Sequence, residues 1–138
     1  MRTRRRTHRR SARVEYLLPD EAESAGTARM LTSQFLARPA FRAVGLDAER
    51  IGDAALIVSE LVTNATRHGG SCRLCLHVSD AQVTVEVYDG SSGRPGVRPL
   101  TTWGESGRGL SMVRYLAQRL DIDPVDGGGN RVRAVLAL

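Results

Sequence analysis

The amino-acid sequence predicts a single α/β domain in which helices cover one face of a sheet. Apolar residues recur at helical spacing in three segments, whereas other segments alternate in hydrophobicity as strands do. The strands form hairpins with one apolar face, and the helices are expected to cover that face. At 138 residues the chain is long enough for one domain with a proper core.

The longest predicted helix runs from Asp47 to His68. Asp47 is the expected N-cap, and Arg67 and His68 suit the negative end of the helix dipole just before two glycines. The residues predicted to face the core are Ile51, Ala54, Ala55, Val58, Leu61, Val62 and Ala65. The polar arc opposite them carries Asp53, Glu60, Asn64 and Arg67.

The elements on either side of this helix follow from similar patterns. Residues 13–18 alternate weakly and predict a first strand, which Pro19 ends. Residues 20–38 carry a small-residue apolar stripe and predict a helix that stops near Pro39. Residues 71–79 and 82–88 predict an antiparallel hairpin because only a short turn joins them.

The C-terminal part is expected to add a helix and a second hairpin. Residues 89–105 are rich in Gly, Pro and Ser and predict a long loop, a length that is usually functional or mobile. The segment 106–109 then opens a helix predicted to run over 110–120. Strands at 120–125 and 131–138, joined by a Gly-rich turn, complete the fold.

The positive charge of the chain is concentrated at its beginning. All 20 basic residues are Arg, and seven lie in the first 13 residues, which contain no acid. Residues 14–138 hold the other 13 arginines and all 15 acids, a net charge of −2, so a mildly acidic domain at 13–138 is predicted to follow a basic, disordered arm at 1–12. Such an arm can bind nucleic acid weakly and without sequence preference. A solubilising tail, or an over-extended start, is the favoured alternative.

No apolar run is long enough to span a membrane, and the N-terminus lacks the apolar segment of a signal peptide. The sequence therefore predicts a cytoplasmic protein without a membrane partner. Cys72 and Cys75 are too few for a disulfide scaffold. With His77 they suggest zinc, but residues three apart on a strand face opposite sides, which favours core or surface roles.

Three features lie in an order that suits nucleotide chemistry. Glu60 and Asn64 are one helical turn apart, Asp89 stands at a predicted strand end, and residues 107–109 read Gly-Arg-Gly at a helix start. A carboxamide oxygen suits Mg²⁺, a carboxylate can accept a proton, and glycines at a helix N-terminus admit phosphate. Each feature alone is weak, and an isolated Glu60/Asn64 pair is read more simply as a solvated helix face.

The functions of His68 and Trp103 can each be interpreted in two ways from the sequence. His68 either extends the polar face of Glu60 and Asn64 toward a metal or, as favoured, interacts with the C-terminal end of its helix. Trp103, the only Trp, either stacks on a base or partner or clasps the long loop.

The motifs resemble those of the GHKL ATPase superfamily. SELVTNATRHG resembles its N box, VEVYDGSSGRP its first glycine box and ESGRGLSMVRYLA its second. The most similar branch is that of the anti-sigma-factor serine kinases, short single-domain proteins common in actinobacteria, and the resemblance spans about residues 13–138. It implies the Bergerat ATP-binding fold, an α/β two-layer sandwich with helices on one face of a mixed, mainly antiparallel sheet.

The resemblance also implies roles for individual residues. Glu60 would be the general base, Asn64 the Mg²⁺ ligand and Asp89 the partner of the adenine amine, with residues 91–105 as the ATP lid. The other implied nucleotide-binding residues are Gly93, Gly107, Arg108, Gly109 and Leu110.

The implied function is that of an ATP- and Mg²⁺-dependent serine/threonine kinase and anti-sigma factor. Its substrate would be an anti-sigma-factor antagonist, its other partner an RNA polymerase sigma factor, and it would form a homodimer. Ser91 departs from the family by standing at the first Gly of the first glycine box, so a nucleotide-binding regulatory module without kinase activity is the alternative. Asp121-Ile122 and Ala134 also replace the usual Trp-Gly and a usual aromatic.

Overall fold

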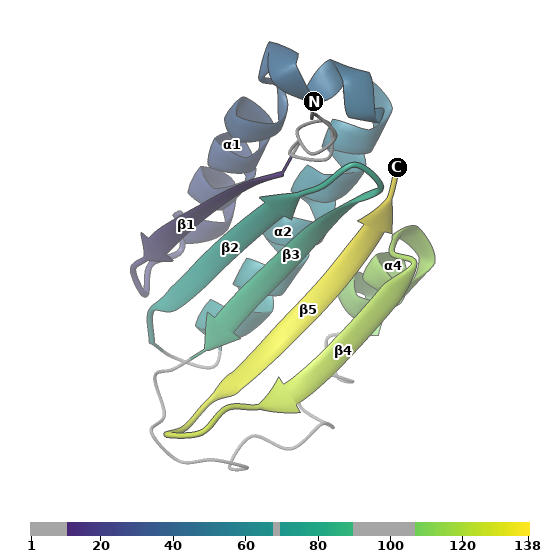
Figure 1. Ribbon diagram of the computed structural model, residues 1–138. Helices are drawn as coiled ribbons and strands as arrows, with labels where there is room; N and C mark the ends of the chain where they lie inside the picture. The colour runs from purple at the N-terminus through teal and green to yellow at the C-terminus, as the bar shows by residue number, and fades with distance from the viewer. Residues whose placement is uncertain (1–10, 68–69, 90–106) are drawn as a thin grey trace.

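Five strands form one sheet, and the α-helices lie together on one of its faces (Figure 1). The computed structural model describes residues 11–67, 70–89 and 107–138, except the side chains of 107 and 108. In chain order the elements are β1 (Ala12–Leu18), α1 (Ser24–Leu36), a 3₁₀ helix (Pro39–Val44), α2 (Ala48–Arg67), β2 (Cys72–Val78), β3 (Gln82–Asp89), α4 (Gly107–Leu116), β4 (Arg119–Pro124) and β5 (Asn130–Ala137).

The strand order in the sheet is β1-β2-β3-β5-β4. The predicted α/β fold class is confirmed, and so are both predicted hairpins, β2–β3 and β4–β5. The mixed pairing that the family resemblance implied is not seen within the described ranges, where every pairing is antiparallel. In the two hairpins, a short turn excludes parallel pairing, because parallel strands need a crossover connection.

The core lies between the sheet and the helices. Leu74, Leu76 and Val78 of β2 stand opposite valines of β3, and those valines stand opposite residues of β5. The facing residues are Val83, Val85, Val87, Val132, Ala134 and Leu136, all at most 1% exposed. The period of two places every second side chain of three central strands on one apolar face. Helix α2 covers this face and contacts β3 most extensively among the strands.

Helix α2 begins and ends within one residue of its predicted limits. The backbone N–H of Arg50 donates to Asp47 Oδ1 at 2.9 Å, so the predicted N-cap is confirmed. The predicted apolar stripe is buried in most of its length, and Ile57 joins it at 0% exposure. Asn64 is only 1% exposed and does not belong to a solvated face. Helix α2 packs against α1 and α4 as well as the sheet, which buries more of its circumference than one stripe.

Two predicted helix boundaries are wrong. Helix α1 begins at Ser24, four residues later than predicted, and a 3₁₀ helix at Pro39–Val44 was not predicted at all. Helix α4 ends at Leu116, whereas the prediction extended it to Leu120. Leu120 instead pairs with Ala134 in the sheet, and long-range pairing with β5 overrides the local helical periodicity. The limits of all five strands agree with prediction within one residue.

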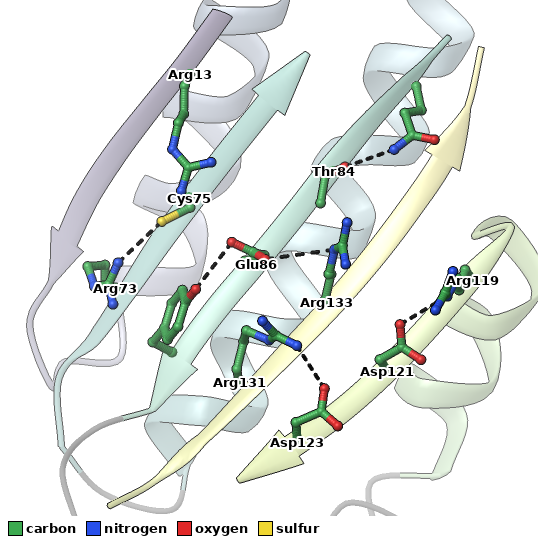
Figure 2. Close-up of polar contacts among 12 residues, drawn as sticks. Arg13, Arg73, Cys75, Thr84, Glu86, Arg119, Asp121, Asp123, Arg131 and Arg133 are labelled. Carbon is green, nitrogen blue, oxygen red and sulfur yellow. Dashed lines mark hydrogen bonds and ion pairs between the residues drawn. The ribbon is translucent and has the colours of Figure 1, made fainter. Parts of the chain in front are cut away.

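The face of the sheet away from the helices is polar and carries cross-strand ion pairs (Figure 2). Arg131 Nη2 lies 2.9 Å from Asp123 Oδ2, and Arg133 Nε lies 3.8 Å from Glu86 Oε2. Ion pairs of this kind, with partly exposed partners, individually contribute little stability. Within the described ranges, no helix combines the length and apolarity needed to cross a bilayer.

Candidate functional site

Helix α2 meets the first turn of α4 through the side chain of Glu60. A Cβ atom built on Gly109 would overlap Glu60 Oε1 and would lie 2.9 Å from Glu60 Cδ. Real Cβ atoms essentially never approach so closely, so only glycine fits at position 109 while Glu60 keeps this rotamer. The half-buried Glu60 carboxylate therefore lies at the N-terminal turn of α4, where the first backbone N–H groups lack partners within the helix and the positive end of the helix dipole lies.

Asn64 stands one turn further along α2. Its side chain is 1% exposed, and its Nδ2 has no hydrogen-bond partner among the described residues. A buried donor without a partner costs about 1–3 kcal/mol. Native proteins usually reserve such a group for a ligand, an ion or an ordered water. The buried Nδ2 group one turn from Glu60 makes this part of α2 a candidate binding surface.

Asp89 occupies the last position of β3 and is 2% exposed. In the sheet register it stands between Cys72 of β2 and Asn130 of β5. All three residues line a cavity of about 270 Å³ at this end of the sheet. A carboxylate there, flanked by a thiol and a carboxamide, can accept hydrogen bonds from a polar ligand.

Sequence reasoning missed Asn130, which it assigned to a turn. The side chain is 8% exposed, so it is a buried polar group beside Asp89. A signal was present in the three glycines before it, all of which adopt positive φ, between 79° and 120°. A turn so rich in glycine brings β5 back sharply and places the first residue of this strand next to the end of β3.

The two cysteines lie on opposite faces of β2, as strand geometry predicts. Cys72 belongs to the apolar core, and its burial raises the pKa of its thiol to about 11. Cys75 faces the polar side, where the guanidinium of Arg73 lies 3.6 Å from its sulfur (Figure 2). Burial first, and then the neighbouring Glu15 carboxylate, raise the pKa of Cys75. Both thiols are therefore protonated near neutral pH and are poor nucleophiles.

The structure brings together part of the predicted site. Glu60 of α2 contacts the first turn of α4, and Asn64 lies one turn further along α2. Helix α2 also packs on β3, which ends at Asp89. Gly109 is in contact with Glu60, whereas the Leu110 side chain is 6% exposed and belongs to the hydrophobic core. Gly107 and Arg108 lie in the backbone of the first turn of α4. The other predicted positions lie outside the described residues: Gly93, the lid at 91–105 with Trp103, and His68.

The histidine kinase-like ATPase domain family matches residues 18–136 of the chain. A protein of Pasteuria penetrans named Anti-sigma F factor is 27% identical over 141 residues, which cover 91% of this chain and 91% of that protein. A protein of the same name from Clostridium acetobutylicum is 29% identical over 97 residues, covering 61% of this chain and 68% of its own length. These names confirm the resemblance to the anti-sigma-factor branch.

A solved structure shares the fold. The crystal structure of the RsbU and RsbW domains of a Mycobacterium tuberculosis protein superposes with a TM-score of 0.67 at 24% identity. The match covers 91% of this chain but 32% of that one, so this chain spans about a third of that protein. The family match extends over most of the sequence and includes α2, β3 and α4, the elements that carry Glu60, Asn64, Asp89 and Gly109. The chain therefore belongs to the histidine kinase-like ATPase domain family and, within it, resembles the anti-sigma factors.

Proposed function

We propose that this chain is an ATP- and Mg²⁺-dependent serine/threonine kinase that acts as an anti-sigma factor. Its protein substrate is an anti-sigma-factor antagonist, and an RNA polymerase sigma factor is its alternative partner. The family supports ATP binding, and the names of the two relatives support the regulatory role. The observation that carries the proposal is the contact between Glu60 and Gly109, one helical turn from the buried Asn64.

Glu60 is the general base of this proposal. The N-terminal turn of α4 supplies backbone N–H groups and a positive dipole end, which together favour phosphate. The contact with Gly109 places the Glu60 carboxylate at that same turn. A carboxylate in this position can accept the proton of a serine hydroxyl that attacks the terminal phosphate of ATP. The bond between that phosphate and ADP breaks as the new ester bond forms.

Asn64 is the proposed residue for Mg²⁺, and its chemistry fits. Mg²⁺ prefers oxygen ligands, and the carboxamide supplies one from a fully buried position. The Nδ2 group, which lacks a partner among the described residues, can donate to a phosphate oxygen. When bound, the ion would neutralise phosphate charge.

Asp89 is proposed to accept a hydrogen bond from the adenine amine, with Cys72 and Asn130 beside it on the neighbouring strands. Gly93, Gly107 and Arg108 complete the proposed nucleotide-binding set on the strength of their motifs.

Phosphate transfer tests the proposal directly. The protein is incubated with labelled ATP, Mg²⁺ and an antagonist domain from the same organism, beside a Glu60→Gln variant. Loss of a general base should slow transfer by about 10²–10⁴-fold. ATP affinity, measured by calorimetry, should change less than about threefold, because the variant keeps the size and shape of the side chain. If Glu60→Gln transfers phosphate as fast as the wild type, the kinase mechanism is wrong.

The second candidate is a nucleotide-gated regulatory module without kinase activity. Ser91 in the first glycine box favours it. This candidate predicts ATP-dependent binding of a sigma factor or an antagonist that survives Glu60→Gln but is lost in Asn64→Ala, with no transfer in any variant. Sedimentation at several protein concentrations tests the proposed homodimer in the same samples.

A further inference from the structure

An apolar groove with a volume of about 450 Å³ lies between the 3₁₀ helix and the first turns of α2. Its apolar lining residues are Ala37, Leu46, Ala48 and Ile51. Two exposed arginines, Arg38 and Arg42, line the same groove. The groove therefore combines an apolar surface with two guanidinium groups, so it suits a ligand that is apolar in one part and anionic in another.

The two arginines carry charge that the described part of the chain does not neutralise. Neither Arg38 nor Arg42 forms an ion pair with a carboxylate of the described residues. One carboxylate lines the groove, that of Asp47, and it accepts the backbone N–H of Arg50 as the N-cap of α2. Two positive charges thus stand against a single negative charge that already has a structural function.

The side chain of Arg38 is held in position by aromatic contacts. Its guanidinium carbon lies 4.9 Å from the centroid of the Phe35 ring, a cation–π contact. Phe35 is itself buried and packs edge-on against Phe41, with ring centroids 5.3 Å apart. A guanidinium that already rests on a fixed ring loses less conformational entropy when it pairs with a ligand.

The groove lies far from the proposed nucleotide site. Helix α2 runs from the groove toward the end of the molecule at which β3 ends (Figure 1). Ala48 and Glu60 are separated by about 18 Å along this helix, and Ala48 and Asn64 by about 24 Å. A side chain bound in the groove therefore reaches neither the proposed base nor the proposed Mg²⁺ ligand.

We infer that this groove docks a short segment of a partner protein in which an apolar side chain lies next to carboxylates. The apolar side chain packs on Leu46 and Ile51, and the carboxylates pair with Arg38 and Arg42, whose planar guanidinium groups can each donate two parallel hydrogen bonds. A groove of this volume holds only a few side chains, whereas a stable dimer buries about 800 Å² or more on each partner. This surface is separate from the proposed kinase reaction and does not depend on it.

Selection from a library of short random peptides displayed on phage tests the inference with the full chain. Phage that bind a variant carrying both Arg38→Glu and Arg42→Glu are removed first. Because that variant keeps the basic residues 1–10, this step discards peptides that bind only there. The peptides that remain and bind the wild type should carry an apolar residue close to one or more acidic residues.

Single variants then locate the binding site of a selected peptide, with Kd measured by fluorescence anisotropy. Ala48→Leu fills the groove, and Ala43→Leu is its matched control because Ala43 is exposed on the 3₁₀ helix but does not line the groove. Arg42→Glu reverses a charge in the groove, and Arg114→Glu does so on the exposed side of α4. We expect Ala48→Leu and Arg42→Glu to raise Kd at least tenfold and the two controls to leave it unchanged. Salt should weaken binding to the wild type by screening the arginines.

Three results would overturn the inference. The first is a selection that enriches no acidic and apolar peptides, and the second is equal peptide affinity for wild type, Ala48→Leu and Arg42→Glu. The third is a sedimentation coefficient that falls in Ala48→Leu, because it would show that a second copy of the chain occupies the groove. All four single variants should keep the ATP affinity of the wild type, so failure of this inference is distinguishable from failure of the proposed kinase function.

Discussion

The carboxylate of Glu60 lies where a Cβ atom on Gly109 would have to stand. Gly109 belongs to the motif that is expected to admit phosphate. It also has a second constraint, because a larger residue at this position would leave no room for the carboxylate of Glu60, the proposed base. This contact joins α2, which carries Glu60, to the first turn of α4, where phosphate binding is proposed, and it makes a specific prediction.

Gly109→Ala should reduce kcat for phosphate transfer at least tenfold, because the new methyl group displaces the Glu60 carboxylate. The cost in stability should be small, because the clash is with the end of a flexible, half-buried side chain that can turn aside, and alanine improves the helix propensity by about 1 kcal/mol. In a Glu60→Ala background, the same substitution should instead stabilise the protein. A double-mutant cycle by thermal unfolding measures the coupling. Additive effects in the cycle would contradict the contact.

Asn64→Ala should abolish the dependence of ATP affinity on Mg²⁺ while leaving Tm unchanged or higher. The variant removes a buried donor that lacks a partner among the described residues, and relief of that penalty offsets the small cavity. Thr32→Ala is the contrasting control, because the buried Thr32 hydroxyl donates to the Ala28 carbonyl oxygen at 2.8 Å. That variant should lose about 1 kcal/mol of stability and keep its ATP affinity.

Asp89→Asn should lower ATP affinity at least tenfold and narrow the preference for ATP over GTP. A carboxylate accepts from an exocyclic amine, whereas the carboxamide of the variant can also donate to a carbonyl oxygen. Calorimetry with both nucleotides gives the ratio of affinities. If the variant has the same ratio of ATP to GTP affinity as the wild type, Asp89 does not contact the adenine ring.

Stability should fall as pH rises from about 9 to about 11, partly through Cys72. Burial raises the pKa of this thiol from 9.0 to about 11, so the folded state retains a proton that the unfolded state has already lost. This contribution to the free energy of unfolding is fully present below pH 9. It is lost as the pH rises through the folded-state pKa of Cys72, and the total loss is about 3 kcal/mol. Denaturant unfolding at pH 8 and pH 10.5 should show a smaller loss in Cys72→Ala than in the wild type.

Deletion of residues 1–10 should leave Tm and ATP affinity unchanged, because the deleted residues precede the sheet. Strand β1 begins at Ala12, and its pairing with β2 begins at the same residue. The deletion removes six arginines. Any weak DNA binding of the full chain should vanish with it. For the full chain, a plot of the logarithm of the DNA-binding constant against the logarithm of the salt concentration should have a slope of about −5. Fluorescence anisotropy at several salt concentrations measures both. Full DNA affinity in the truncated chain would assign this activity to the folded domain.

The periodicity of the sequence predicted most elements but not all of their limits. Val83, Val85 and Val87 alternate so regularly that β3 was placed within one residue. The predicted end of α4 is wrong because the apolar residues of 110–120 recur at helical spacing. The pairing of Leu120 with Ala134, which ends the helix earlier, depends on a strand that comes later in the chain. The 3₁₀ helix after Pro39 is too short to leave a periodic signal.

The sequence by itself determined the fold class, the N-cap and the apolar face of the main helix, and the spacing of Glu60 and Asn64, because these depend on neighbours within one or two turns. Only the tertiary structure decided that Asn64 is buried, that Asn130 stands beside Asp89, and that Glu60 rests on Gly109. Each of these relationships joins residues far apart in the chain, or depends on which sides of α2 its neighbours cover. Local patterns carry no information about such contacts until the elements are packed.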